Sequence, residues 1–174
     1  MILLVDIGNT RVKWATQVDG RLSPQRAAGY AQWSAVDWQH ELFDGPPVER
    51  VLAATVAGGD SRQALETAAR KAGIRRVDFV ASTATLAGVR NAYPDPGLLG
   101  VDRWVAVIGA YHLAQAACCV VDIGTAATLD AVDASGQHLG GFIVPGPQLM
   151  VRSLHAGTNN LAAHTAASPV GGTQ

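Results

Sequence analysis

Short apolar runs alternate with amphipathic stretches along this chain, and glycine- or proline-containing breaks separate them. The first residues predict a β-rich start, with strands at Ile2–Asp6 and Val12–Gln17 and a third strand after the Asp19-Gly20 turn. A helix is predicted over Trp33–Phe43, and Val48–Val56 predicts a buried strand. The chain is therefore expected to open with a β hairpin.

The alternation continues through the middle of the chain. A helix capped by Asp60 or Ser61 is predicted to run to Lys71, with Gly73 in the first position beyond its C-terminal cap. Arg76–Ala81 predicts another strand. Strands and helices in this order favour an α/β architecture with parallel strands.

Residues 82–100 differ from the rest of the chain in composition and pattern. They are rich in proline and glycine and show no clear periodicity, which is typical of a functional loop. A helix is predicted over Val101–Gln115, and a second hairpin begins at Cys118. Its third strand is expected from about His138 to Val144, after which Pro145-Gly146-Pro147 opens a last helix.

The phrase Val-Asp-Ile-Gly occurs twice, at residues 5–8 and 121–124. One constant offset superposes Asp6 on Asp122 and Gly8 on Gly124, and the match continues without a gap to the next turn of each copy. Each copy predicts a strand, a tight bend carrying an acid and a glycine, and a second strand. Asp-x-Gly alone is a common turn composition. The length of the match nevertheless favours an internal duplication that sets two acid-bearing bends opposite each other.

Composition narrows the class of protein. Of the 174 residues, 48% are hydrophobic and 16% are charged, which is typical of one globular domain or two small ones. A net charge of −1 gives no general attraction for nucleic acid or an anionic membrane. No run approaches the roughly 18 apolar residues that span a bilayer. Residues 1–5 lead into Asp6 without a basic leader or cleavage-like site, so we expect a cytoplasmic protein.

Cysteine and histidine offer little for a metal site. Cys118 and Cys119 are adjacent in an apolar run, so they lack the spacing of a metal knuckle and are expected to be buried strand thiols. The 5 histidines form no ligand-like pair. The tryptophans are expected in the core or at an interface; they are Trp14, Trp33, Trp38 and Trp104.

The first bend carries the chemistry of a phosphate site. Gly8 lets the backbone approach a ligand closely, and Asn9 and Thr10 add side-chain donors to the bend's N–H groups. Asp6 would repel a bare phosphate, so a cation between them is expected, most simply Mg²⁺ held through water. Lys13 can neutralise further phosphate charge. Together these residues favour a nucleotide polyphosphate site over a solvated hairpin tip.

The second bend and the loop-to-helix junction add two further groups. Thr125 and Thr128 can bond a phosphate oxygen or order a cation, and Asp122 needs a cation or donor partner. Asp102, in a first helical turn that favours its ionised form, can accept the proton of an attacking hydroxyl. Arg103 can bind a carboxylate through two parallel hydrogen bonds from its guanidinium. The alternative for Asp102 and Arg103 is a helix cap and a surface ion pair.

In this order the motifs resemble those of the type III pantothenate kinases, a branch of the acetate kinase, sugar kinase, Hsp70 and actin-like superfamily that includes the Bvg accessory factor proteins. The resemblance runs from residue 1 to about residue 165. Four motifs carry it: Asp6-Ile7-Gly8-Asn9-Thr10, Tyr93 ahead of Gly100-Val101-Asp102-Arg103-Trp104, Asp122-Ile123-Gly124-Thr125-Ala126-Ala127-Thr128, and Gly140-Gly141-Phe142-Ile143-Val144-Pro145-Gly146.

The resemblance implies transfer of the γ-phosphoryl group of ATP to the primary hydroxyl of pantothenate, the first step of coenzyme A biosynthesis. Asp102 would be the general base, and Asp122 would bind a monovalent cation, K⁺ or NH₄⁺. The ATP phosphates would be held, with help from Thr125, by Asp6, Ile7, Gly8, Asn9, Thr10, Arg11, Val12 and Lys13. Pantothenate would contact Tyr93, Gly100, Val101, Asp102 and Arg103, with Thr173 as a loosely matched further contact.

The implied fold is α/β, a duplicated actin-like (ribonuclease H-like) fold with mixed sheets flanked by helices. Residues 1–100 would form the first half, and residues 101–174 the start of the second. Family members continue beyond this point, so the second half is expected to be truncated, which would expose one sheet face. A homodimer is expected. Two alternatives stay open: a regulatory protein that keeps the nucleotide cleft, and a related kinase with another acceptor.

Overall fold

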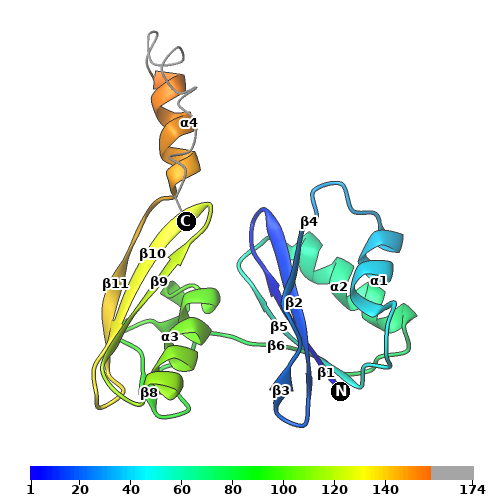
Figure 1. The fold of residues 1–174 in the computed structure, drawn as a ribbon, viewed down its shortest axis with the longest axis horizontal. Coiled ribbons are helices and arrows are strands. Elements are labelled where there is room, and N and C mark those ends of the chain that lie inside the picture. The colour runs from blue at the N-terminus through cyan, green and yellow to red at the C-terminus, as the bar shows by residue number, and fades with distance from the viewer. Residues whose placement is uncertain (158–174) are drawn as a thin grey trace, which may run out of the picture.

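The computed structural model describes residues 1–157, which form two parts, each built around its own β-sheet (Figure 1). The first sheet holds six strands in the order β3-β2-β1-β5-β6, with β4 paired to β2. These strands are β1 Ile2–Ile7, β2 Arg11–Val18, β3 Arg21–Leu22, β4 Arg26–Gly29, β5 Arg50–Thr55 and β6 Val77–Phe79. The helices of this part are α1 Ala35–Phe43 and α2 Gly59–Lys71. The predicted elements occur in the predicted order, and β4 is an additional strand that was not predicted.

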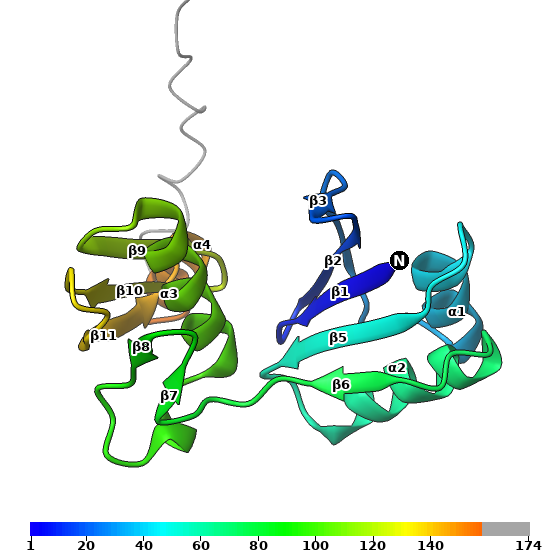
Figure 2. The ribbon, with the colours of Figure 1, turned by 90° about the horizontal axis from the view of Figure 1, so that it is seen from below.

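The first sheet is mixed, as the resemblance implied. β1 runs antiparallel to β2 and parallel to β5, and β5 runs parallel to β6. The parallel strands follow one another in a single direction across the sheet. Right-handed crossovers between them therefore place α1 and α2 side by side on one face (Figures 1 and 2).

The core of the first part lies between that face and the two helices. Alternate residues of β1 point into it, which leaves Leu3, Val5 and Ile7 almost fully buried. The helices contribute Trp38 and Leu65, among others. Trp33 packs edge-on against both Trp38 and Trp14, with ring centroids 5.1 and 6.1 Å apart. The aromatic side chains thus serve packing, as the sequence predicted.

The two helices begin in different ways. α1 has a capping box in which Ser34 Oγ accepts from the Asp37 amide while Asp37 accepts from the Ser34 amide. α2 begins after Gly58 with no side-chain cap, so the expected cap at Asp60 or Ser61 is wrong. Ser61 Oγ instead donates to the Gly58 carbonyl at 2.8 Å, because it already lies inside the first turn. Gly73 has φ +79° just beyond α2, as predicted.

Residues 82–100 form a small hairpin and one 3₁₀ turn rather than an unstructured loop. The elements are β7 Thr85–Leu86, β8 Val89–Arg90 and η1 Pro96–Leu98. Val89 and Leu99 are buried in a second core with Trp104, Val107 and Val132. Since this segment packs with the C-terminal elements, we propose that the boundary between the halves precedes residue 89 instead of lying at residue 100.

The second part is a three-stranded antiparallel sheet in the order β11-β10-β9. Its elements are α3 Val101–Ala114, β9 Cys118–Ile123, β10 Ala126–Val132, β11 His138–Pro145 and α4 Pro147–Gly157. Helix α3 covers one face of the sheet, and the second core lies between them (Figures 1 and 2). Across residues 1–157, no helix combines the length and apolar character needed to cross a membrane.

The other face of this sheet is apolar and exposed. Ile123 is 68% and Phe142 73% exposed, and Val121 shares their face because strand residues alternate between faces. Among residues 1–157, this sheet face is left open. The expectation of buried thiols is wrong, because Cys119 points to this same open face and is exposed, while Cys118 is half-buried beneath α3.

Candidate active site

The two repeated bends meet at one cavity of about 180 Å³ between the halves. Its lining residues are Asp6, Gly8, Asn9, Thr10, Arg11, Lys13, Val56, Asp102, Asp122, Gly124, Thr125, Ala126 and Thr128. Both hairpins and the first turn of α3 therefore contribute to a single site. Ile7 and Val12, expected among the phosphate-binding residues, are fully buried in the first core. Only their backbones are available at the bend.

The first bend is closed by a backbone hydrogen bond. The Gly8 amide donates to the Arg11 carbonyl at 3.0 Å, and a Cβ on Gly8 would lie only 3.3 Å from that oxygen. Tyr30 Oη donates to the Gly8 carbonyl at 2.7 Å and fixes the bend from behind. Asn9 and Thr10 remain exposed at the tip. The bend thus keeps a narrow backbone and presents Asn9 and Thr10 to the cavity.

The second bend mirrors the first and touches it. The Gly124 amide donates to the Ala126 carbonyl at 2.9 Å, and the Gly146 amide donates to the Thr125 carbonyl at 3.0 Å. The hydroxyls of Thr10 and Thr125 lie 3.1 Å apart, one from each tip. This contact joins residues that the internal repeat placed at corresponding corners. The two halves therefore approach each other at their bends.

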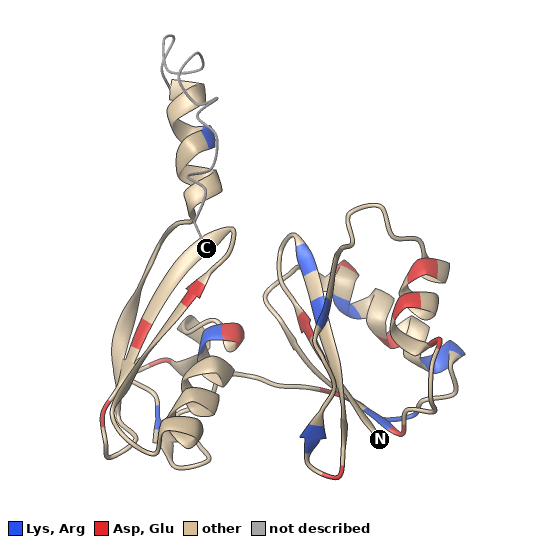
Figure 3. Cartoon of the chain, viewed as in Figure 1, with Lys and Arg blue, Asp and Glu red and all other residues tan. Residues whose placement is uncertain are grey.

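Three carboxylates surround the cavity. Burial raises the pKa of Asp6, and the nearby charges of Asp102 and Asp122 raise it further, while Lys13 at 3.7 Å opposes them. Figure 3 shows acidic positions on β1, β9 and the start of α3, with basic positions on β2 beside them. Negative charge is therefore concentrated where a cation-bound phosphate would sit.

The carboxylates at the cavity lie apart and do not form an all-protein metal cage. Within residues 1–157, no three His, Cys, Asp or Glu side chains come close enough together to hold a metal ion. Carboxylate oxygens spaced around a polar cavity suit a Mg²⁺ ion that keeps several waters and also binds phosphate oxygens. Oxygen ligands of this kind match the cation chemistry predicted from the first bend.

Asp102 stands at the start of α3, with its carboxylate at the cavity. Gly100 is the N-cap residue and supplies no side-chain cap. Asp102 Oδ1 instead accepts from the Arg103 amide at 2.8 Å. A Cβ on Gly100 would lie 2.6 Å from the same oxygen, so glycine leaves the space that the carboxylate occupies. The loop-to-helix junction is thus shaped around Asp102.

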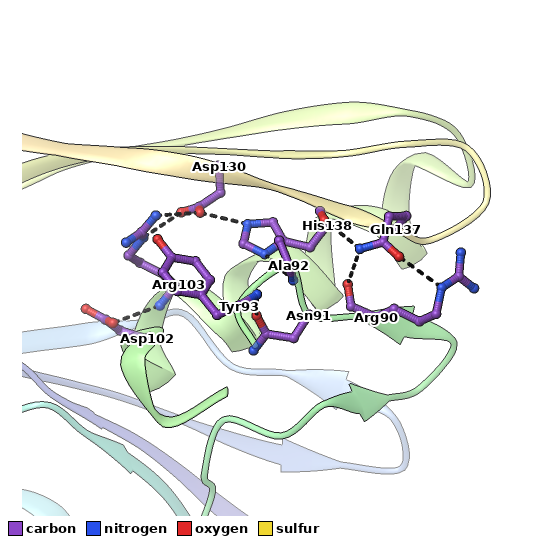
Figure 4. Close-up of polar contacts among 9 residues, drawn as sticks. All are labelled: Arg90, Asn91, Ala92, Tyr93, Asp102, Arg103, Asp130, Gln137 and His138. Atoms are coloured by element: carbon purple, nitrogen blue, oxygen red, sulfur yellow. Dashed lines mark hydrogen bonds and ion pairs between the residues drawn. The ribbon is translucent and has the colours of Figure 1, made fainter. Parts of the chain in front are cut away.

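Arg103 does not form the surface ion pair that was weighed as the alternative. It is 7% exposed, and its Nε and Nη2 donate to the two oxygens of Asp130 at 2.7 and 2.6 Å (Figure 4). His138 Nε2 lies 3.0 Å from Asp130 Oδ1. Asp130 and His138 were missed by the sequence reasoning. An acid within the apolar pattern of residues 126–132 was the one signal that could have indicated them.

Tyr93 belongs to this cluster and not to the bends. Its ring stacks on His138 with centroids 6.2 Å apart and an interplanar angle of 20°. Asp130 raises the pKa of Arg103, and a hydrogen bond with Tyr93 adds to that effect. Tyr93, Asp102 and Arg103 therefore lie together around the start of α3. Thr173 falls outside the described residues.

The sequence model of the type III pantothenate kinases matches residues 2–174. A type III pantothenate kinase of Aromatoleum aromaticum is 42% identical over 161 residues, and one of Azoarcus sp. is 41% identical over 162 residues. Each alignment covers 92% of this chain, which spans only 65% and 61% of those two relatives.

The solved structures similar to this chain have low sequence identity to it, so they show only that the fold is shared. A Baf family protein of Campylobacter jejuni is 22% identical, with a TM-score of 0.52 over 99% of this chain and 68% of its own. The ethanolamine utilization protein EutJ of Carboxydothermus hydrogenoformans is 16% identical, with a TM-score of 0.51 over 89% of this chain and 55% of its own. This chain therefore shares its α/β fold with these proteins. On the family match and the relatives together, the chain belongs to the type III pantothenate kinase family.

Proposed function

We propose that this chain carries the catalytic residues for ATP-dependent phosphorylation of pantothenate. The observation that carries the proposal is the shared cavity, where the two repeated bends and Asp102 meet. A phosphate site alone would serve any nucleotide-binding protein of this fold. A carboxylate at the same cavity adds a group that can accept the proton of a hydroxyl acceptor.

ATP would place its phosphates between the bends. The backbone N–H groups near Gly8, the hydroxyls of Thr10 and Thr125, and Lys13 offer donors and positive charge from both sides. Asp6 and Asp122 would hold Mg²⁺ through its waters, and the resemblance assigns Asp122 a monovalent cation as well. Such cations neutralise phosphate charge as it develops during transfer. Burial first, and then the nearby charges of Asp102 and Asp122, raise the pKa of Asp6, which supports a site that favours cations.

The acceptor would approach from the side of α3. Its hydroxyl oxygen forms the new bond to the γ-phosphorus, the bond from that phosphorus to the ADP oxygen breaks, and the hydroxyl proton passes to Asp102. Tyr93 and residues 100–103 would line the acceptor pocket. Because Asp130 already occupies Nε and Nη2 of Arg103, a bidentate grip by this fork on a pantothenate carboxylate is not supported. We assign Arg103 to the wall of the pocket.

The test is a coupled assay of ADP release, with and without pantothenate, on wild type, Asp102→Asn and Asp60→Asn. Asp60 is the matched control, because it is an exposed acid in the first turn of α2. We expect Asp102→Asn to lower kcat by about a hundredfold or more, with nucleotide affinity nearly intact. Asp60→Asn should behave as wild type. The assay includes a longer family member beside this chain, since the chain spans part of its relatives.

Three results would count against the proposal in different ways. Loss of nucleotide affinity with unchanged turnover in Asp102→Asn would remove its role as base. Equal, negligible ADP release with and without pantothenate would favour a regulatory protein that keeps the cleft. Phosphorylation of a sugar or acetate, and not of pantothenate, would select a related kinase. A homodimer, implied by the resemblance, is tested by light scattering on the same samples.

A further inference from the structure

A buried charged cluster lies directly behind Asp102. It consists of Arg103, Asp130 and His138, which are 7%, 2% and 0% exposed. Burying charges has a large desolvation cost that only good geometry offsets, so a fully buried set of this kind is weak evidence for stability alone. Its placement next to the proposed base in the chain suggests a positional role.

The hydrogen bonds of His138 select one tautomer of its neutral ring. The Ala92 amide donates to His138 Nδ1 at 3.4 Å, and a backbone N–H can only donate. Nδ1 is therefore an acceptor, and the proton of a neutral ring sits on Nε2. Nε2–H then donates to Asp130 Oδ1 at 3.0 Å. The ring thus links the segment before Tyr93 to β10 (Figure 4).

Asp130 in turn holds Arg103 from both oxygens. Oδ1 accepts from His138 and from Arg103 Nη2, and Oδ2 accepts from Arg103 Nε. Gly141 packs directly against this ion pair, because a Cβ on Gly141 would collide with Asp130 Oδ1 and with Arg103 Nη2. Arg103 is therefore fixed in orientation, and with it the first turn of α3.

We propose that Asp130 and His138 are positioning residues, which lock Arg103 so that the neighbouring Asp102 carboxylate is aimed into the cleft between the bends. The proposal rests on the proposed function of Asp102. His138 also supports Tyr93 through their stacked rings, so one buried cluster would orient two sides of the acceptor pocket. Neither Asp130 nor His138 lines the cleft itself.

The test compares three variants in the same kinase assay. His138→Leu removes both hydrogen bonds of the ring, whereas His138→Gln keeps an N–H donor at a similar reach toward Asp130. The matched control is His112→Leu, because His112 is exposed, does not line the cleft, and has its Nε2 2.7 Å from the Ala87 carbonyl oxygen. Asp130→Asn is avoided, since it leaves a buried guanidinium without its partner and endangers folding.

We expect His138→Leu to lower kcat about tenfold or more, as expected for a displaced catalytic group, with KM for ATP within about twofold of wild type. His138→Gln should recover most of that loss, and His112→Leu should match wild type. A wild-type kcat in His138→Leu would overturn the proposal. So would equal losses in the Leu and Gln variants together with a raised KM for ATP, because that pattern indicates general damage.

A second readout does not depend on turnover. The Trp104 amide donates to the Gly100 carbonyl at 3.0 Å in the first turn of α3, so its hydrogen exchange reports on that turn. Exchange about tenfold faster in His138→Leu, but not in the Gln or His112 variants, supports the positioning role. Equal exchange in all variants overturns it. A wild-type chain without pantothenate kinase activity overturns the proposed function, and the exchange data then decide the positioning inference separately.

Discussion

Substitution of Gly146 by alanine probes how tightly the second bend is supported. Gly146 is buried where β11 leads into α4, and its amide donates to the Thr125 carbonyl at 3.0 Å. A Cβ on Gly146 would collide with the Gly124 carbonyl oxygen and lie 2.7 Å from that of Thr125. Both contacts involve backbone atoms that cannot turn aside. The bend itself must therefore move.

The loss of stability in Gly146→Ala can be estimated from this steric overlap. Overpacking a tightly packed site costs about 1–3 kcal/mol. For a protein of this size each kcal/mol lowers Tm by about 2–4 °C, so we expect Tm to fall by roughly 2–12 °C. Because the displaced bend carries Thr125 into the cavity wall, affinity for Mg²⁺-ATP should fall by several fold, measured by isothermal titration.

Gly109→Ala is the matched control. Gly109 is exposed in α3, and a Cβ there meets nothing within 4 Å. Replacing glycine by alanine inside a helix should stabilise the protein by about 1 kcal/mol and leave nucleotide affinity unchanged. If Gly146→Ala kept the wild-type Tm and affinity, the support of the second bend by β11 would be refuted.

Two further predictions concern the first half. Asp6→Asn should raise Tm near neutral pH. The pKa of Asp6 is raised in the folded protein, so ionisation of this carboxyl destabilises the fold as pH rises through that pKa. Below about pH 4 the variant and wild type should have the same Tm, and a higher Tm of the variant there would contradict this cause. The same variant should bind Mg²⁺-ATP less tightly. Ser34→Ala should cost about 1 kcal/mol through loss of the α1 capping box, and Ser34→Asp should restore most of it in thermal melts; equal stability of all three would remove the cap's role.

The hairpins and helices could be predicted because their signals are local. The Asp19-Gly20 turn, Gly73 and the repeated Asp-x-Gly bends each fix the backbone within a few residues, and the repeat indicated that the bends would meet. The contact between Thr10 and Thr125 joins corners that the sequence already placed in corresponding positions. Local turn and cap residues and the internal repeat were therefore sufficient to predict most of the fold.

The cluster behind Asp102 could not be predicted from the sequence. Its members come from α3, β10 and β11, and only tertiary packing brings Arg103 to Asp130 and His138. A strand acid such as Asp130 is compatible with either face until the register is known. Cys119 was misplaced for the same reason, since one face of its sheet is left exposed among the described residues.

The central claim is that both bends bind the phosphates of one nucleotide. Backbone amide signals of Gly8 and Gly124, followed by NMR during titration with Mg²⁺-ATP, test it most directly. The account predicts that both signals shift together with a single Kd. Shifts confined to one bend, or absent from both, would contradict it.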